Sequence, residues 1–448
     1  MAQPAGNGRR RVLGLVFLTV FVDLIGFSVL FPLFPDLLAW YLEREGDGSP
    51  LARLVAWLTE LVSGRPGAQF AVVTLFGGIL GSVYSLLQFL FAPFWGALSD
   101  RIGRRKTLLV TLGGTALAYL LWMFAGSFAL LVAARILGGI MAGNISTASA
   151  AAADVSDAKN RAGGMAIVGM AIGLGFVLGP ALGATAYHLV DAMALWPAGA
   201  RWGWNPFSGA AAVAFALALF NVLWAFWRFP ETLPPVSPEE RRRRASERLL
   251  HGLAPWRALA RINLPGVRRA NLVYLATQTA FAAMEFTLVF LAAERFGFAP
   301  KDNAWMFVFV GLVIALVQGG FVRRRAAQIG EKRLMLLGIV LLVPGFAGLG
   351  LAGSVGTLYL ALFLLATGSA LFVPTLSALV SLYTPADRQG IAMGAFRSMG
   401  ALSRAIGPLA GGLLYWALGS TAPYVIGAVF LALPLALARG LPQPAPPE

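Results

Sequence analysis

The sequence has 448 residues, of which 58% are hydrophobic and only 12% charged, and its mean hydropathy is +0.74. A soluble chain of this length carries about twice that share of charged residues, so the surplus apolar surface is expected to face lipid. The net charge of +15 does not indicate nucleic-acid binding, because the basic residues lie in the gaps between apolar runs. The absence of cysteine and the two widely separated histidines argue against disulfides, thiolate chemistry and a metal centre.

Twelve apolar runs are long enough to cross a bilayer, which takes about 20 residues in a helix. Several exceed that length, so we expect tilted helices or helices that extend beyond the lipid. Three arginines lead into the first run without a small-residue cleavage site, which predicts a retained first helix rather than a signal peptide. The predicted spans cover residues 12–34, 68–95, 107–127, 129–150, 162–189, 209–228, 271–293, 303–322, 334–353, 356–382, 390–417 and 421–438.

The gaps between the spans predict the orientation in the membrane. With the N-terminus inside, 26 of the 35 Lys and Arg residues fall in cytoplasmic gaps, 6 fall outside and 3 lie within spans. Basic residues concentrate on the cytoplasmic side, so both termini are predicted to be cytoplasmic. In the first outside gap, residues 51–62 have apolar positions at helical spacing. This predicts an amphipathic helix on the outer surface, with a lid over a substrate entrance as the alternative.

Two spans carry an acid near their middle. Asp23 lies in the first span and Glu285 in the seventh. A carboxylate at such a depth costs about 3 kcal/mol or more unless it is paired, protonated or facing water, so an intramembrane acid is by default a functional residue. Both acids are therefore predicted to be proton or substrate sites. The alternative for Asp23 is a structural hydrogen bond to a neighbouring helix.

A charged segment separates the second and third spans. Residues 100–106 hold five charges, four of them basic. Gly96 precedes this segment, Gly103 lies within it, and the third span follows it. These charges cannot lie in hydrocarbon, and their sign favours the cytoplasmic side. We therefore expect a tight turn at the membrane surface, packed closely against neighbouring helices.

The chain repeats its landmarks after 224 to 228 residues. Gly179-Pro180 in the fifth span corresponds to Gly407-Pro408 in the eleventh, and the basic segment after Gly96 corresponds to residues 320–333. Such duplication is typical of transporters that bind substrate where the two halves meet. We predict an N-terminal bundle of residues 1–228, a cytoplasmic linker of 229–270 and a C-terminal bundle of 271–448. Within the linker, a solvated tether is favoured over a short membrane-surface helix at 249–261.

Several motifs resemble those of one family. The run Gly96-Ala-Leu-Ser-Asp100-Arg101-Ile-Gly103-Arg104-Arg105-Lys106 resembles the signature turn between helices 2 and 3 of the major facilitator superfamily. Residues 23–35 resemble the first helix of proton-coupled drug antiporters of the tetracycline-exporter type, which include tetracycline-transporter-like proteins of eukaryotes. Residues 175–183 resemble the glycine–proline motif of antiporter helix 5, and residues 135–139 the helix 4 arginine motif.

The resemblance implies an all-α membrane fold of twelve helices in two pseudo-symmetric six-helix bundles. It implies that Arg135 takes part in proton coupling with Asp23 and Glu285; the alternative is an arginine that holds the bundle through backbone carbonyls. It also implies a conformational latch in which Asp100 reaches the N-terminal end of helix 11. The second copy has Arg324 in place of Asp100, so only the first half is expected to form the latch. The latch residues are Gly96, Asp100, Arg101, Gly103, Arg104 and Arg105.

The substrate cavity is predicted between the two bundles. Its candidate lining comprises aromatic residues, amides and one arginine: Phe27, Phe31, Tyr84, Gln88, Asn144, Gln278, Phe281 and Arg404. The alternative for each amide is a hydrogen bond to another helix, the commoner use of amides in bundles. Small residues of the fifth span permit close helix contact; the packing residues of this span are Gly175, Gly179, Pro180 and Gly183. The glycines of the span are expected to face the second half: Gly169, Gly173, Gly175, Gly179 and Gly183.

These patterns predict a secondary transporter that works by alternating access and exports a lipophilic or amphipathic small organic molecule in exchange for protons. A uniporter or a lipid or organic-anion exporter of the same fold is the first alternative, and a non-transporting receptor or scaffold the second. An enzyme is not expected, because no metal-ligand cluster, phosphate loop or nucleophile elbow is found. We expect no cofactor besides protons, no metal and no nucleic-acid partner. The predicted protein is a monomer in a bacterial inner membrane or a eukaryotic plasma or organelle membrane.

Overall fold

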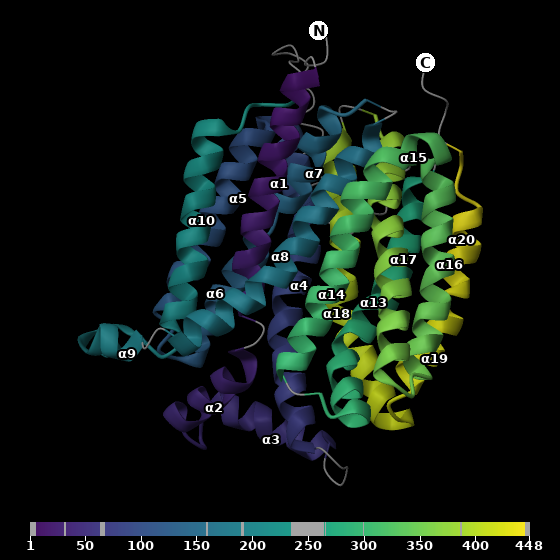
Figure 1. The fold of residues 1–448 in the computed structure, drawn as a ribbon. Coiled ribbons are helices and arrows are strands. Elements are labelled where there is room, and N and C mark those ends of the chain that lie inside the picture. The colour runs from purple at the N-terminus through teal and green to yellow at the C-terminus, as the bar shows by residue number, and fades with distance from the viewer. Residues whose placement is uncertain are drawn as a thin grey trace.

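The computed structural model describes residues 6–30, 33–62, 68–157, 160–189, 192–233, 264, 266–298, 300–385 and 388–443. Within these ranges the regular elements are helices and none is a strand. Figure 1 shows the long helices standing side by side, with the start of α1 and the labels of both chain ends at one end of the molecule. We call this the terminal end. The opposite end, which carries α2 and α3, is called the far end.

The helices fall into two groups along the chain. The N-terminal group comprises α1 (Gly6–Ser28), α2 (Phe34–Glu45), α3 (Pro50–Val62), α4 (Ala68–Ile102), α5 (Arg104–Met123), α6 (Phe128–Met141), α7 (Asn144–Asp154), α8 (Arg161–Leu189), α9 (Ala192–Leu195), the 3-10 helix η3 (Pro197–Trp202) and α10 (Ser208–Arg228). The C-terminal group comprises α13 (Val267–Phe296), α14 (Pro300–Leu316), the π-helix η4 (Val317–Val322), α15 (Arg323–Ile329), α16 (Glu331–Gly350), α17 (Val355–Leu382), α18 (Gln389–Leu418), α19 (Ala422–Phe430) and α20 (Ala432–Arg439).

Nine helices of the described residues are long and apolar enough to cross a membrane. These nine do not include the long helices α4, α8 and α18, although at 35, 29 and 30 residues each exceeds the length that a bilayer requires. Twelve crossings therefore remain a prediction. The linker prediction falls largely outside the described residues, as does the proposed surface helix at 249–261.

Two local expectations are corrected. Residues 96–102 are not a turn, because α4 continues through Gly96 and ends at Ile102; only Gly103, with φ of 104°, breaks the helix before α5. After this break, Arg104 begins α5 and binds Asp100 near the end of α4 at 2.6 Å, so the two charges neutralise each other where the helices meet. The predicted fourth span is also interrupted, between α6 and α7. The break is at Gly143, which lies so close to the Trp95 ring that a side chain there would overlap it.

The long loop after α1 holds two helices. The expected amphipathic helix is confirmed as α3, whereas α2 was not predicted. Leu58 of α3 is buried and packs against Ile79 of α4 and Trp416 of α18. The loop therefore touches both helix groups at the far end.

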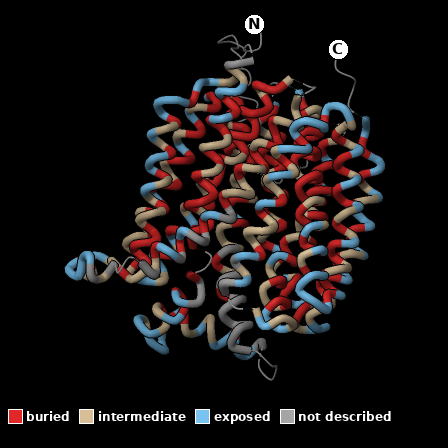
Figure 2. Tube along the Cα trace, in the orientation of Figure 1, coloured by how far each residue is buried: buried red, intermediate tan, exposed pale blue. Residues whose placement is uncertain are grey.

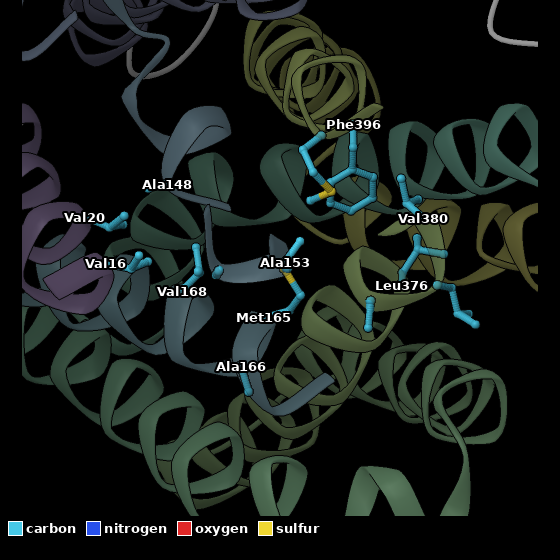
Figure 3. Packing of buried hydrophobic residues seen from close by; sticks show 14 of the residues in the cluster. Val16, Val20, Ala148, Ala153, Met165, Ala166, Val168, Leu376, Val380 and Phe396 are labelled. Atoms are coloured by element: carbon cyan, nitrogen blue, oxygen red, sulfur yellow. The ribbon is translucent and has the colours of Figure 1, made fainter. Parts of the chain in front are cut away.

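Among the described residues, the largest apolar cluster joins the two groups at the terminal end. One cluster there joins α1, α5, α7 and α8 to α13, α16, α17 and α18, and Figure 3 shows part of it, from Val16 on α1 to Leu376 on α17. At the far end, each group has a separate cluster of its own. Figure 2 shows the buried residues on the inward sides of the helices and the exposed ones on the outer surface. The two groups are thus joined more extensively at the terminal end than at the far end.

Candidate functional site

Asp23 is held by an amide from a neighbouring helix. Its side chain is 9% exposed and hydrogen-bonds to the side chain of Asn144. The Asn144 Oδ1 atom accepts the backbone N–H of Ile145 at 2.9 Å, which leaves the amide nitrogen to donate to the carboxylate. The break between α6 and α7 places Asn144 at the start of α7, where its backbone can turn the side chain toward α1. The structure thereby brings together Asp23 and Asn144, which were both predicted as site residues.

Arg135 lies among aromatic rings rather than against an acid. Its guanidinium carbon is 4.5 Å from the ring centroid of Tyr84 and 5.6 Å from that of Phe27, and the two rings are 4.7 Å apart. Tyr84 lies within electrostatic range of both Asp23 and Arg135. Among the described residues, however, no ion pair within 4.0 Å includes Arg135. The predicted coupling of Arg135 to Asp23 would therefore run through aromatic residues or water.

Two arginines of α18 face the N-terminal group. The Arg404 Nη2 atom donates to Gln88 Oε1 at 2.6 Å, and the Arg397 Nη2 atom donates to Ser149 Oγ at 3.1 Å. They are seven residues apart, which is about two helical turns, so they occupy one face of α18. The sequence prediction included Arg404 but not Arg397. The seven-residue spacing of two intramembrane arginines was the signal that could have found it.

Glu285 is the acid of the C-terminal group. It is exposed and lies within electrostatic range of Arg404. An accessible carboxylate in the middle of a membrane helix faces either lipid or a water-filled interior, and the nearby Arg404 favours the interior. Phe281 and Gln278 precede it by four and seven residues, so both lie on the same face of α13. Phe31, the remaining cavity candidate, lies outside the described residues.

The charged residues of this central region sum to a positive charge. Three arginines, Arg135, Arg397 and Arg404, accompany two acids, Asp23 and Glu285. With both acids ionised the sum is +1, and with both protonated it is +3, because an arginine does not lose its proton in proteins. Arg397, which the sequence prediction did not include, therefore makes this central region positive.

The latch residues form a buried ion network at the terminal end. Arg104 is fully buried, and its guanidinium binds Asp100 at 2.6 Å and Asp154 at 2.9 Å. The second oxygen of Asp100 accepts the backbone N–H of Ile391, the third residue of α18, at 2.9 Å. Asp100 thus connects α4 to the positive N-terminal end of α18, the contact that the resemblance implied.

A residue far along the chain completes this network. Glu231, just after α10, accepts the backbone N–H groups of Arg104 at 2.9 Å and of Arg105 at 3.3 Å. It therefore caps the N-terminus of α5, where Gly103 offers no side chain to do so. Thr232 donates its hydroxyl to Asp154 at 3.1 Å. Sequence analysis missed both residues, because nothing local connects Glu231 to a helix start 127 positions earlier.

The glycines of α8 pack closely against two partners. Added Cβ atoms at Gly169 and Gly173 would lie 2.6 Å from Gln318 Oε1 and 3.3 Å from Ile314 Cγ2, so these two glycines face the second half as expected.

The other three glycines of α8 face the first helix instead. An added Cβ atom would lie 2.6 Å from the Leu24 Cβ at Gly175, 1.9 Å from the Ser28 Oγ at Gly179 and 2.1 Å from the Val29 carbonyl oxygen at Gly183. These contacts are with α1 and the residue that follows it, so for these three glycines the expectation that they face the second half is wrong. The backbone at the end of α1 approaches too closely for any side chain. Pro180 lies in the same helix.

A membrane bundle with intramembrane charges and a charged latch is the architecture of a transporter, and the comparisons agree. The Major Facilitator Superfamily model matches residues 16–329 and 321–448. The chain therefore belongs to the major facilitator superfamily. It is an integral, multi-pass membrane protein of a family of transporters rather than enzymes.

Individual relatives place it in the tetracycline-transporter-like group. It is 38% identical to Major facilitator superfamily domain-containing protein 10 of Bos taurus, over 97% of this chain and 94% of that protein. It is 27% identical to the class B tetracycline resistance protein of Escherichia coli, over 75% of this chain and 78% of that protein. The crystal structure of the human organic anion transporter MFSD10 (TETRAN) superposes with a TM-score of 0.82 and 34% identity, covering 96% of this chain and 99% of that one.

Proposed function

We propose that the protein is a proton-coupled secondary transporter that exports an amphipathic organic molecule bearing an anionic group. The observation that carries this proposal is the pair Arg397 and Arg404 on one face of α18, with Glu285 beside Arg404. Two arginine forks in a cavity are suited to a carboxylate or a similar planar anion. The aromatic rings of Phe27, Tyr84 and Phe281 would contact its apolar part.

The proposed mechanism exchanges protons for substrate at the two acids. Protons bind Asp23 and Glu285, and the anionic substrate binds the α18 arginines. Glu285 lies within electrostatic range of Arg404, so its protonation state changes the charge that the substrate meets at this arginine. Exchange requires that the protein changes conformation when it is loaded with protons or with substrate, but not with both. The relatives named above support an amphipathic substrate, since they include an organic anion transporter and tetracycline resistance proteins.

The proposed cycle is a rocking of two six-helix bundles, residues 1–228 and 271–448, joined by the 229–270 linker. Both termini are cytoplasmic in this proposal, on the strength of the basic gaps. The Asp100 contact with α18 closes the cytoplasmic side, and its release opens that side to substrate. A shared core at the terminal end and separate cores at the far end support this assignment.

A flux assay in proteoliposomes tests the proposal. We expect an imposed pH gradient to drive uptake of an amphipathic carboxylate dye, and a neutral amide of the same dye to be carried at least tenfold more slowly. Asp23→Asn should abolish the response to the pH gradient. Arg397→Gln and Arg404→Gln should each raise the substrate concentration for half-maximal flux, whereas the exposed Arg439→Gln serves as the control.

Each alternative gives a different result. Flux that ignores the pH gradient in the parent and in Asp23→Asn would identify a uniporter. Tight dye binding without flux would identify a receptor or scaffold. Equal flux of the carboxylate and its amide would exclude an anionic recognition element at the α18 arginines.

A further inference from the structure

Arg135 is a buried cation without a counter-charge. It is 6% exposed, and its Nε and Nη2 atoms have no hydrogen-bond partner among the described residues. Arg104, by contrast, is fully buried and binds two carboxylates, at 2.6 and 2.9 Å. A buried charge is expensive unless it is paired and hydrogen-bonded. The difference between the two arginines points to a partner of Arg135 that is not part of the protein.

The surrounding side chains do not supply that partner. The rings of Tyr84 and Phe27 attract the guanidinium through their faces, an electrostatic contact that leaves the N–H groups along its edge without acceptors. Asp23 bonds to Asn144 and forms no ion pair with Arg135 within 4.0 Å. Two unpaired N–H groups on a permanent cation are suited to an anion.

A small cavity lies beside this arginine. It is lined by Arg135 together with Thr115, Ala118, Tyr119 and Trp122, and its volume is ≈ 10 Å³. That is close to the minimum for one water-sized particle. The lining contains tyrosine and tryptophan groups that can donate hydrogen bonds, but no carboxylate; the Thr115 hydroxyl donates to the Thr111 carbonyl oxygen at 3.0 Å. An arginine and the lack of a carboxylate favour an anion over a cation in this cavity.

We propose that this cavity binds one small monovalent anion, chloride under physiological conditions, as the counter-charge of Arg135. The site is distinct from the α18 arginines, and it does not depend on what the protein transports. Bound chloride neutralises Arg135, which shares Tyr84 as a neighbour with Asp23, and so sets the charge of the central region. Removing chloride leaves that cation uncompensated.

Halide-dependent thermal unfolding of the full-length protein in detergent tests the site. Chloride or bromide is titrated against gluconate at constant ionic strength. We expect the unfolding temperature of the parent to rise saturably with chloride and with bromide, and to stay flat with gluconate. A ligand that binds only the folded state stabilises it in this way.

Filling the cavity provides the matched variant. Ala118→Val adds two methyl groups to the lining, and we expect it to lose the halide response whatever its own stability. Gly113→Ala, on the same helix with nothing within 4 Å of its added atom, should keep the response. If Ala118→Val does not fold, bromide-soaked crystals of the parent give the second readout, an anomalous peak beside Arg135.

Three results would overturn the proposal. The first is an unfolding temperature that ignores halides, with no bromide peak, which would mean a water in the cavity. The second is a halide response that survives in Ala118→Val, which would locate the ion elsewhere. The third is stabilisation by an organic carboxylate alone, which would assign Arg135 to the transported substrate.

Discussion

The basic segments around Gly103 and Gly330 share a backbone geometry but differ in the burial of their charged side chains. Gly103 and Gly330 each break the chain between two helices, with φ of 104° and 95°. After Gly103 comes the fully buried Arg104, which binds Asp100 and Asp154. Before Gly330 come three arginines on α15, residues 323–325, and all three are exposed. The glycine geometry is thus common to both halves of the repeat, whereas the ion network belongs to the first alone.

The difference also extends to how the following helix is capped. In the second half, α16 has an acid of its own in its first turn, Glu331, and no side-chain cap. The first half caps α5 with Glu231, from beyond α10. The first segment therefore ties together four distant parts of the chain. In the second segment, Lys332 donates to the Leu441 carbonyl oxygen, and no ion pair of this segment is found among the described residues. Because only the segment around Gly103 forms this network, we expect that segment, and not the one around Gly330, to control closure of the terminal end.

The largest expected effect is on stability, from removing the centre of the first network. Arg104→Ala leaves Asp100 and Asp154 buried without their cation, a loss that costs about 3–5 kcal/mol in buried pairs. Arg324→Ala, in the second segment, should change stability by less than about 0.5 kcal/mol, as exposed substitutions usually do. Thermal and denaturant unfolding in detergent measure both. Equal losses in the two variants would contradict the proposed asymmetry.

The next largest expected effect is a loss of stability when a side chain is added at a glycine that packs against a neighbouring helix. Such glycines occur in both halves of the chain. In the second half, an added Cβ at Gly411 would lie 2.6 Å from the Ala283 carbonyl oxygen on α13; at Gly183 the distance to the Val29 oxygen is 2.1 Å. Overpacking costs about 1–3 kcal/mol, so Gly183→Ala should destabilise the protein more than Gly411→Ala.

Gly14→Ala is the control for these two variants. Nothing lies within 4 Å of an atom added there, and replacing a helical glycine with alanine gains roughly 0.5–1 kcal/mol. Its unfolding midpoint should rise while the other two fall. A rise at Gly183→Ala would show that α1 and α8 can separate without loss.

The smallest effect is a shift of conformational population. Asp100→Asn removes the negative charge at the N-terminus of α18, an interaction of about 0.3–1 kcal/mol, so the closed terminal end should lose population roughly two- to five-fold. The chain has no cysteine, so an introduced cysteine pair across the terminal ends of α4 and α18 reports this closure by crosslinking. Arg324→Asn should leave the yield unchanged. Crosslinks that form equally in Asp100→Asn and the parent would exclude the latch.

Sequence reasoning succeeded where a residue's role follows from its own helix. The intramembrane position of Asp23 and Glu285 and the amphipathic helix α3 were readable from local patterns. The contact of Asp100 with the start of α18 was implied by family resemblance alone. These features need only the period of a helix or the cost of a charge in lipid.

The failures are contacts between distant segments. Spacing showed that Gly179 and Gly183 needed a close neighbour, but the identity of that neighbour depends on the packing of α8 against α1. Glu231 binds a helix start 127 residues away, and no local signal records this. Arg397 was passed over because a lone intramembrane arginine has no recognisable motif, although its pairing with Arg404 follows from their spacing.

The contact of Leu58 with Trp416 has a consequence for the rate of the cycle. α3 belongs to the far-end loop of the N-terminal group, yet Leu58 is buried against a tryptophan of the C-terminal group. If the groups rock as proposed, opening the far end must separate these two side chains, while opening the terminal end need not. In that cycle, the contact of α3 opposes opening of the far end but not of the terminal end. A shorter or more polar loop would then leave the protein spending more of its time with the far end open.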